Sequence, residues 1–401
     1  MTSTATPSMQ HPSLAEARSI LIVRLDALGD VVLMSPFLRE LRRNAPKARI
    51  TLIVRPPELN LVELCPHVDH IITFQGKLGN PSRARLAWRY FVFCASHIWM
   101  RRWDVAINPR FDVDYYGATR LLSLTRAARR IGYSASVTPN KKRLNPRHDR
   151  WLTDPLYACS ARHEVLHNID VIRQLGGSSG DDRLELWLSV EDDRVAQKLT
   201  ERFGGDSERL CAIVPAAAEA RKVWPAEYYA QVVRFMCKQL NCNVVVVGGR
   251  DARDFGSRME AELPSQVLST AGRLTIRQSA ALLKRCKLTL SNDSGPMHLA
   301  AAAGSQVVAI SCHPVTGEGG HDKSPIRFGP WGSSHKVLQP LSATPPCTTF
   351  CGEDSSHCIR GVSPEQVLDT VSQLLSGEPR VAAPDRGRYD VSAHASPGVV
   401  R

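Results

Sequence analysis

Short apolar runs alternate with amphipathic segments along the first part of the chain. The first run is SILIVR at residues 19–24, and a second covers residues 48–54. Between them, residues 31–44 carry apolar side chains at loosely helical spacing. Near-continuous apolar runs of this length are typical of parallel strands buried on both faces. The pattern predicts a strand-helix-strand unit, followed by further strands at residues 71–74 and 105–108.

A second alternating series begins after a loop-rich region, residues 135–185, in which we expect one helix at 163–175. We expect an entry strand at 185–188 and further strands at 210–215, 243–247, 267–268, 288–290 and 306–310. Helices are expected at 190–203, 226–239, 251–263, 276–285 and 364–375. Such alternation predicts an α/β protein with two doubly wound parallel sheets, which we expect to face each other across a cleft.

A length of 401 residues suits two domains rather than one. We expect an N-terminal domain over residues 18–185 and a C-terminal domain over 186–376. Residues 1–17 and 377–401 have the polar, Pro-bearing composition of disordered tails.

The composition is that of a soluble globular protein, with 43% hydrophobic and 22% charged residues. No apolar run is long enough to span a bilayer. The N-terminus lacks the apolar core of a signal peptide, so we expect the protein to stay in the cytoplasm. Eleven irregularly spaced cysteines fit reduced thiols in that compartment.

The basic excess is concentrated in one stretch. The net charge is +12, and residues 77–150 hold sixteen Lys or Arg against four Asp and no Glu, which is also 16 − 4 = +12. Such a field favours an acidic partner, namely a phosphorylated substrate, an anionic membrane surface or nucleic acid. The alternative is a solvated basic face with no partner.

Within that stretch, residues 84–100 are aromatic and are flanked by Arg83, Arg101 and Arg102. They are too few to cross a membrane. They suit either an amphipathic helix lying in a membrane interface or a core helix with a basic outer side, and the core helix is favoured.

Residues 292–302, NDSGPMHLAAA, join a predicted strand to a helix of small residues. The turn lies outside the carboxyl end of a strand, where α/β sheets bind ligands. Asp293 can accept hydrogen bonds from hydroxyls or cap the helix, and Ser294 and Gly295 can contact a phosphate at its N-terminus. Capping alone does not require His298 one turn later, so a ligand site is favoured over a simple capped helix.

The end of the first strand carries Arg24, Gly29 and Asp30. Glycine lets the backbone approach a ligand, and Asp30 can act as a general base or as the N-cap of the following helix. Local sequence does not separate these alternatives. Lys222 follows the strand at 210–215, where a cation can neutralise a leaving diphosphate. The adjacent Trp224 and Pro225 are expected to fix the start of the next helix.

Cys347, Cys351, His357 and Cys358 resemble a metal cluster at first sight. Their C-x3-C-x5-H-C spacing lacks the paired short loops of structural zinc sites. Packed, reduced thiols are therefore favoured over zinc, and we predict no metal.

Five segments occur in the order seen in the heptosyltransferase family, which is glycosyltransferase family nine of bacterial lipopolysaccharide core assembly. They are IVRLDALGDVVLMSPFLRELRRNAPKARITLIVRP, RKVWP, VVVVGGRD, NDSGPMHLAAAAGSQVVAIS and PCTTFCGEDSSHC. The resemblance covers residues 19–375. It implies a GT-B fold of two Rossmann-like domains, with the acceptor in the first and the nucleotide sugar in the second. It also implies inverting transfer from ADP-heptose without an essential metal or other cofactor.

The resemblance assigns roles to individual residues. Asp30 matches the general base that deprotonates the acceptor hydroxyl, and Lys222 matches the cation on the donor phosphates. Asp293 matches the carboxylate that holds sugar hydroxyls, and His298 matches a helix histidine that supports the site or contacts phosphate. Ser294 and Gly295 match the backbone that binds the diphosphate. We also expect Gly248 and Gly249 to bind donor, and Arg24 and Gly29 to bind acceptor.

Two departures from the family pattern stand out. Residues 215–218 read PAAA where relatives carry a glycine and a hydroxyl residue, which leaves the identity of the donor open. Residues 311–332 form a longer loop than usual, and its His313, His321 and Lys323 either touch the donor or belong to a lid.

The partners implied are an ADP-sugar donor and an acidic, phosphorylated glycolipid acceptor at the inner face of the cytoplasmic membrane, with no nucleic acid. The basic stretch would steer and dock the enzyme there as a peripheral membrane protein. Two alternatives remain on the same scaffold, namely a nucleotide-sugar isomerase of the 2-epimerase type and a nucleotide-sugar binding protein without turnover.

Overall fold

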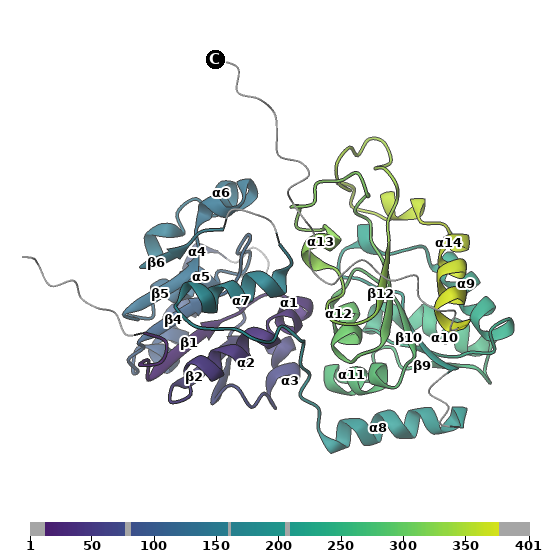
Figure 1. Ribbon diagram of the computed structural model, residues 1–401, viewed down its shortest axis with the longest axis horizontal. Coiled ribbons are helices and arrows are strands. Elements are labelled where there is room, and N and C mark those ends of the chain that lie inside the picture. The colour runs from purple at the N-terminus through teal and green to yellow at the C-terminus, as the bar shows by residue number, and fades with distance from the viewer. Residues whose placement is uncertain (1–12, 77–81, 159–161, 205–208, 377–401) are drawn as a thin grey trace, which may run out of the picture.

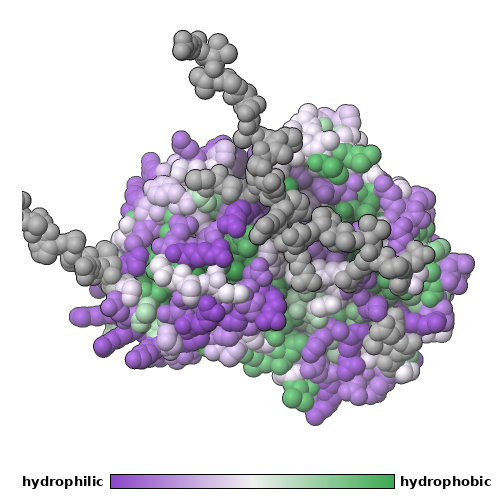
Figure 2. Space-filling model, viewed as in Figure 1, coloured by the Kyte–Doolittle hydropathy of each residue, from purple (hydrophilic) through white to green (hydrophobic). Residues whose placement is uncertain are grey.

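The computed structural model describes residues 13–76, 82–158, 162–204 and 209–376. They form two α/β halves that lie side by side, each built on a parallel sheet with helices around it (Figure 1). The face drawn in Figure 2 is largely hydrophilic over the N-terminal half, with small hydrophobic patches between polar side chains.

The first sheet has six strands in the order β3-β2-β1-β4-β5-β6, and its neighbouring strands pair in parallel. The strands are β1 (Ser19–Val23), β2 (Arg49–Val54), β3 (His70–Thr73), β4 (Val105–Asn108), β5 (Arg129–Tyr133) and β6 (Asp154–Leu156). In the central strand, Ile20 is paired with Ile50 on one side and Val105 on the other. The apolar runs found in the sequence are therefore the buried centre of this sheet.

The second sheet has the order β12-β11-β10-β7-β8-β9, and its neighbouring strands are again parallel. The strands are β7 (Leu210–Val214), β8 (Asn243–Val246), β9 (Val267–Ser269), β10 (Leu288–Asn292), β11 (Gln306–Ile310) and β12 (His335–Leu338). Counted from its own first strand, each sheet has the order 3-2-1-4-5-6 of a dinucleotide-binding fold. The prediction of two doubly wound sheets is confirmed.

The helices follow the predicted alternation. Those of the first half are α1 (Leu28–Leu33), α2 (Ser35–Asn44), α3 (Leu59–Val62), α4 (Arg83–Phe93), α5 (Ala118–Ser123), α6 (Pro139–Leu144) and α7 (Glu164–Gln174). The others are α8 (Val190–Thr200), α9 (Ala226–Lys238), α10 (Arg253–Glu262), α11 (Ile276–Lys284), α12 (Gly295–Ala302), α13 (Pro325–Phe328) and α14 (Pro364–Ser376). As predicted, α9 begins directly after Pro225, and the buried Trp224 donates its indole N–H to the Val362 carbonyl at 2.8 Å.

Several local predictions were wrong. The helix expected at 31–44 begins at Leu28 and is divided at Met34 into α1 and α2, with Pro36 in the first turn of α2. Residues 185–188 form no strand. Strands β5, β6 and β12 were missed because their exposed or half-exposed positions interrupt the apolar pattern.

The N-terminal tail is shorter than predicted. Residues 1–12 and the predicted tail at 377–401 lie outside the described residues, but Leu14 and Ala17 are buried in the core of the first half. These two side chains hold residues 13–17 against the domain.

The predicted core helix at 84–100 is α4 followed by a π-helical turn, Cys94–Ile98. One face buries Tyr90, Phe93 and Cys94, as expected of a core helix. The outer side is not simply basic, because Trp88 is 64% exposed. Within the described part of the chain, no helix has both the length and the apolar character needed to cross a membrane.

A buried ion-pair network joins the two halves. Arg327 of α13 is fully buried, and its guanidinium contacts Asp112 at 2.6 Å and Glu164 at 3.5 Å, both in the first half. Nearby, the His163 ring stacks on Trp331 with 4.4 Å between ring centroids. The 311–332 loop, whose role the sequence left open, therefore connects the two halves.

Candidate active site

The predicted site residues follow the strands at which each sheet reverses its order. In the first half, α1 follows β1 and Arg110 follows β4. In the second half, Lys222 follows β7 and α12 follows β10. These pairs of central strands are the topological switch points of the two sheets, where open α/β sheets bind ligands. The contacts between α1 and α12 bring the two switch points together.

Asp30 lies in the first turn of α1, and its side chain is partly exposed. Ala27 is the N-cap of this helix and makes no side-chain cap bond, so Asp30 is not the cap. Its Oδ1 accepts from Arg24 at 3.2 Å and from Arg110. Both arginines donate to Oδ1, and no described residue donates to Oδ2. The carboxylate is thus held through one oxygen and open through the other.

Arg24 is fully buried, with no exposed surface. Its guanidinium contacts Asp26 at 2.9 Å, and it contacts both Asp30 and Glu164 at 3.2 Å. We expected Arg24 to bind acceptor, but every described contact of its guanidinium is internal. The geometry assigns it the task of orienting the Asp30 carboxylate.

Lys222 and Asp293 form an ion pair at the end of the second sheet, with 2.8 Å between Nζ and Oδ2. Burial acts to lower the pKa of Lys222, but the charge of Asp293 and its hydrogen bond outweigh burial and hold that pKa above its ordinary value. Lys222 therefore stays cationic at neutral pH. The structure brings together two residues that are 71 positions apart in the chain.

The N-terminus of α12 is not capped by a side chain. Ser294 occupies the N-cap position in extended conformation, and neither its hydroxyl nor the Asp293 carboxylate bonds to a backbone N–H of the helix. The predicted capping alternative for Asp293 is therefore excluded. The half-buried Ser294 and Gly295 leave N–H groups at this helix end without a side-chain partner.

Gly29 and Gly295 are packing glycines between the halves. A Cβ at Gly29 would lie 2.6 Å from the ring of His298, and a Cβ at Gly295 would lie 3.0 Å from Leu28. We expected Gly29 to approach a ligand, but its open side is filled by His298. The two glycines let α1 and α12 pack closely.

His298 lies between the two parts of the site. Burial lowers its pKa to about 4, against the opposing charges of Asp293 and Asp30. The ring is therefore neutral at pH 7. Its Nδ1 is buried without a hydrogen-bond partner among the described residues.

Comparisons with known proteins agree with this architecture. A model of glycosyltransferase family 9 (heptosyltransferase) matches residues 140–350, just over half of the chain. The chain belongs to glycosyltransferase family 9. Its membership supports the glycosyltransferase interpretation.

Three distant relatives match most of the chain. A lipopolysaccharide core heptosyltransferase, OpsX of Haemophilus influenzae, is 24% identical over 82% of this chain and 86% of its own. The structure of a family 9 glycosyltransferase from Veillonella parvula superposes with a TM-score of 0.72 at 23% identity, covering 90% of this chain and 97% of that one. The E. coli heptosyltransferase WaaC, solved with ADP, has a TM-score of 0.63 at 15% identity and covers 89% and 99%. The fold is of the GT-B type.

Other predicted residues of this family 9 enzyme lie near the same sheet edge. Gly248 and Gly249 follow β8 after Val247, at the carboxyl end of the strand next to β7. Ala216 and Ala217 are half-buried after β7 and offer no side-chain hydrogen bond. These four residues can offer a ligand only their backbone polar groups.

In the 311–332 loop, Lys323 pairs with Glu219, close to Lys222 in the chain. The His321 ring stacks between His313 at 5.5 Å and Phe350 at 4.4 Å between centroids. His313, His321 and Lys323 therefore contact one another or neighbouring segments, and none of them extends freely into solvent.

Sequence reasoning missed Arg110, Glu164, Asp112 and Arg327. Burial acts to raise the pKa of Glu164, but Arg110, Arg24 and Arg327 overcome it and lower that pKa to about 2. The partners are separated by long stretches of chain, 140 residues for Arg24 and Glu164. The one available signal was a charged residue within two positions of the end of a central strand, as at Arg110.

Four buried histidines have pKa values well below the ordinary value of histidine. Burial lowers the pKa of His163 to about 3, and of His167, His298 and His313 to about 4. The unfolded chain binds these protons near pH 6.5. Stability from the neutral rings is therefore complete above pH 6.5 and is lost as pH falls towards 4. Burial raises the pKa of Asp26 to about 6, which acts in the opposite direction below pH 6.

We expect the free energy of unfolding to fall between pH 6.5 and pH 4, because four histidines outweigh one aspartate. Urea denaturation at half-unit pH steps measures this, and His298→Asn should make the pH dependence shallower. Stability that stays constant or rises on acidification would contradict the expected neutral histidines.

Proposed function

We propose that this enzyme transfers a heptosyl group from ADP-heptose to a hydroxyl of a lipopolysaccharide core acceptor, with inversion at the anomeric carbon. The observation that carries the proposal is that Asp30 and the Lys222–Asp293 pair both lie near enough to His298 to act on its charge, across the contact between α1 and α12. We assign the acceptor to the N-terminal domain and the donor to the C-terminal domain, with the boundary near residue 185.

The acceptor side supplies the base. Oδ1 of Asp30 is held by Arg24 and Arg110, so Oδ2 can accept the proton of an acceptor hydroxyl as its oxygen attacks the anomeric carbon. The bond from that carbon to the diphosphate oxygen breaks as the new glycosidic bond forms. Attack from the face opposite the leaving diphosphate inverts the configuration.

The donor side supplies positive charge that offsets the negative charge of the leaving diphosphate. Lys222 lies where it can meet the diphosphate oxygens, on which negative charge grows as the bond breaks. The N–H groups at the start of α12 add the partial positive charge of a helix N-terminus. Asp293 keeps Lys222 in place and can accept from sugar hydroxyls. Ser294, Gly248 and Gly249 complete the donor site, and His298 supports it as a neutral ring.

Nucleotide preference tests the donor. Thermal shift of the full chain with ADP, UDP, GDP and CMP, and with their sugars, should show selective stabilisation by ADP and ADP-heptose. Product formation is then followed by mass spectrometry with a heptose-deficient core acceptor. Selective stabilisation by UDP or GDP would overturn the donor and implicate the alanines at 216–218. Consumption of the nucleotide sugar without acceptor would refute transfer.

Lys222→Met should weaken the binding of ADP-heptose by roughly 10- to 100-fold, because one charge-assisted contact to the diphosphate is lost. Isothermal titration calorimetry measures the change. Lys238→Met removes an exposed lysine of the same domain and serves as the matched control. Equal affinity of Lys222→Met and wild type would remove Lys222 from the donor site.

We further propose that the enzyme docks on the inner face of the cytoplasmic membrane, where its glycolipid acceptor lies. Exposed Trp88 and Phe91 stack on each other at 5.6 Å on the outer side of α4, and Met100 is 85% exposed just beyond it. Exposed Arg101 and Arg102 follow. Aromatic side chains beside arginines suit an anionic lipid surface. The basic stretch contributes less than its charge suggests, because Arg110 and Lys141 are buried.

Vesicle binding tests the docking surface. An Arg101→Glu/Arg102→Glu variant should sediment less with phosphatidylglycerol vesicles than wild type does. An Arg183→Glu/Arg194→Glu variant changes the net charge equally at two exposed arginines elsewhere and should bind as wild type does. Equal loss in both variants would mean that only net charge attracts the protein to lipid.

A further inference from the structure

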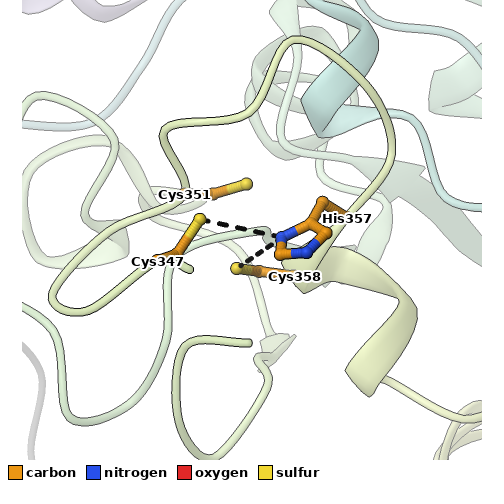
Figure 3. Close-up of side chains that lie close together, drawn as sticks. All are labelled: Cys347, Cys351, His357 and Cys358. Carbon is orange, nitrogen blue, oxygen red and sulfur yellow. Dashed lines mark hydrogen bonds between the residues drawn. The ribbon is translucent and has the colours of Figure 1, made fainter. Parts of the chain in front are cut away.

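Four potential metal ligands converge in the loop between β12 and α14. The ligand atoms of Cys347, Cys351, His357 and Cys358 all lie within 4.8 Å of one another. Figure 3 shows the three sulfur atoms and the imidazole ring directed towards a common centre. Cys351 and Cys358 are buried, and the other two ligands are half-buried. We propose that this cluster is a structural Zn²⁺ site.

The distances fit a tetrahedron around zinc. Zinc bonds of about 2.3 Å to sulfur and 2.0–2.1 Å to nitrogen place the sulfur and nitrogen corners of a tetrahedron about 3.5 Å apart. His357 Nδ1 lies 3.5 Å from Cys358 Sγ and 3.7 Å from Cys347 Sγ. The cluster needs only small side-chain adjustments to coordinate the ion.

The surrounding backbone fits thiolate ligands. The Thr344 N–H points at Cys358 Sγ and the Gly352 N–H at Cys347 Sγ, each at 3.4 Å. Such N–H groups stabilise the charge of metal-bound sulfur and orient the ligands. Binding releases the three thiol protons and forms three sulfur–zinc bonds and one nitrogen–zinc bond.

The chemistry of the ligand set selects the ion and its role. Three thiolates and one imidazole make up the Cys3His ligand set of structural tetrahedral zinc sites. Four protein ligands fill the coordination sphere and leave no position for substrate or water. The site is therefore structural. The sequence favoured packed thiols, because the C-x3-C-x5-H-C spacing lacks the paired short loops of structural zinc sites. The folded conformation of the loop brings the four ligands together.

The loop between β12 and α14, which carries the four ligands, contacts two segments near the Lys222–Asp293 pair. Arg221, next to Lys222, donates to the Cys351 carbonyl at 3.2 Å. On another side, Phe350 stacks on His321 of the 311–332 loop. Zinc would therefore fix a loop that contacts both the segment carrying Lys222 and the 311–332 loop. This consequence for donor binding rests on the proposed function, whereas zinc binding itself does not.

Metal analysis tests the proposal. The full chain is purified in reducing buffer without chelators or metal-affinity resin, and its metals are measured by inductively coupled plasma mass spectrometry. We expect about one zinc per wild-type chain and less than about 0.2 in Cys347→Ser and His357→Ala. Cys65→Ala and His335→Gln change a cysteine and a histidine outside the cluster and should keep the full zinc content.

Cobalt substitution keeps the test decisive if a ligand variant folds poorly. Wild-type protein stripped of metal and refilled with Co²⁺ should show the intense visible absorption of a tetrahedral cobalt thiolate, which Zn²⁺ abolishes. Zinc content near zero together with no cobalt spectrum would overturn the site, as would a disulfide between two of the three cysteines. Zinc binding that persists while ADP-heptose fails to bind would separate this proposal from the proposed function.

Discussion

Asp30→Asn is expected to lower kcat by about 10²- to 10⁴-fold, the range that a general base contributes. The substitution preserves shape, and the amide oxygen can still accept from Arg24 and Arg110 as Oδ1 does now. The fall in kcat therefore measures the loss of the proton acceptor and not a loss of the hydrogen bonds from Arg24 and Arg110. The variant should bind ADP-heptose as wild type does, because Asp30 lies on the acceptor side.

Steady-state kinetics with saturating donor and acceptor measures the effect, with calorimetry for donor affinity. Asp181→Asn is the matched control, because Asp181 is a partly exposed carboxylate of the N-terminal half that also contacts two arginines. Its kcat should not change. If Asp30→Asn kept more than about a tenth of wild-type kcat, another group would have to accept the proton.

Arg327→Met is expected to destabilise the protein by about 3–5 kcal/mol, the cost of leaving buried charges without their partner. The guanidinium is fully buried between Asp112 and Glu164 and packs over the rings of Phe111 and Phe328, each at 5.1 Å. Glu164 would still pair with Arg24, so Asp112 is the buried carboxylate that would lose its ion-pair partner. The melting temperature should fall by on the order of 10 °C.

Differential scanning fluorimetry and urea denaturation measure the loss. Arg234→Met is the control, because Arg234 makes an exposed pair with Glu262 and should cost at most about 1 kcal/mol. Asp112→Asn in combination with Arg327→Met should restore part of the stability, since the unpaired charge is then removed. A destabilisation of Arg327→Met no larger than that of Arg234→Met would show that the bridge does not hold the halves together.

The central strands were predictable because burial on both faces demands a continuous apolar run. Ile20 to Val23 and Leu210 to Val214 are buried throughout and were found at once. Strands β6 and β12 lie at sheet edges and have partly exposed residues, so their pairing comes from the neighbouring strand and not from an apolar pattern of their own.

The position of the candidate site residues at strand ends was predictable for a related reason. Asp30, Lys222 and Asp293 each follow a central strand, and the carboxyl ends of parallel strands share one edge. The role of each side chain at that edge was not predictable. Arg24 and Gly29 were expected to bind acceptor, yet one is buried among carboxylates and the other packs on His298.

The sequence by itself determined the alternation of strands and helices, the two similar halves and the placement of the candidate site residues at strand ends, because periodicity and strand-end position are local properties. Only the tertiary structure decided that Lys222 pairs with Asp293, that Arg327 crosses to Asp112, and that three cysteines and a histidine meet around one centre. Those contacts join positions whose separation in the chain follows no rule, so only the packing of the folded chain selects them.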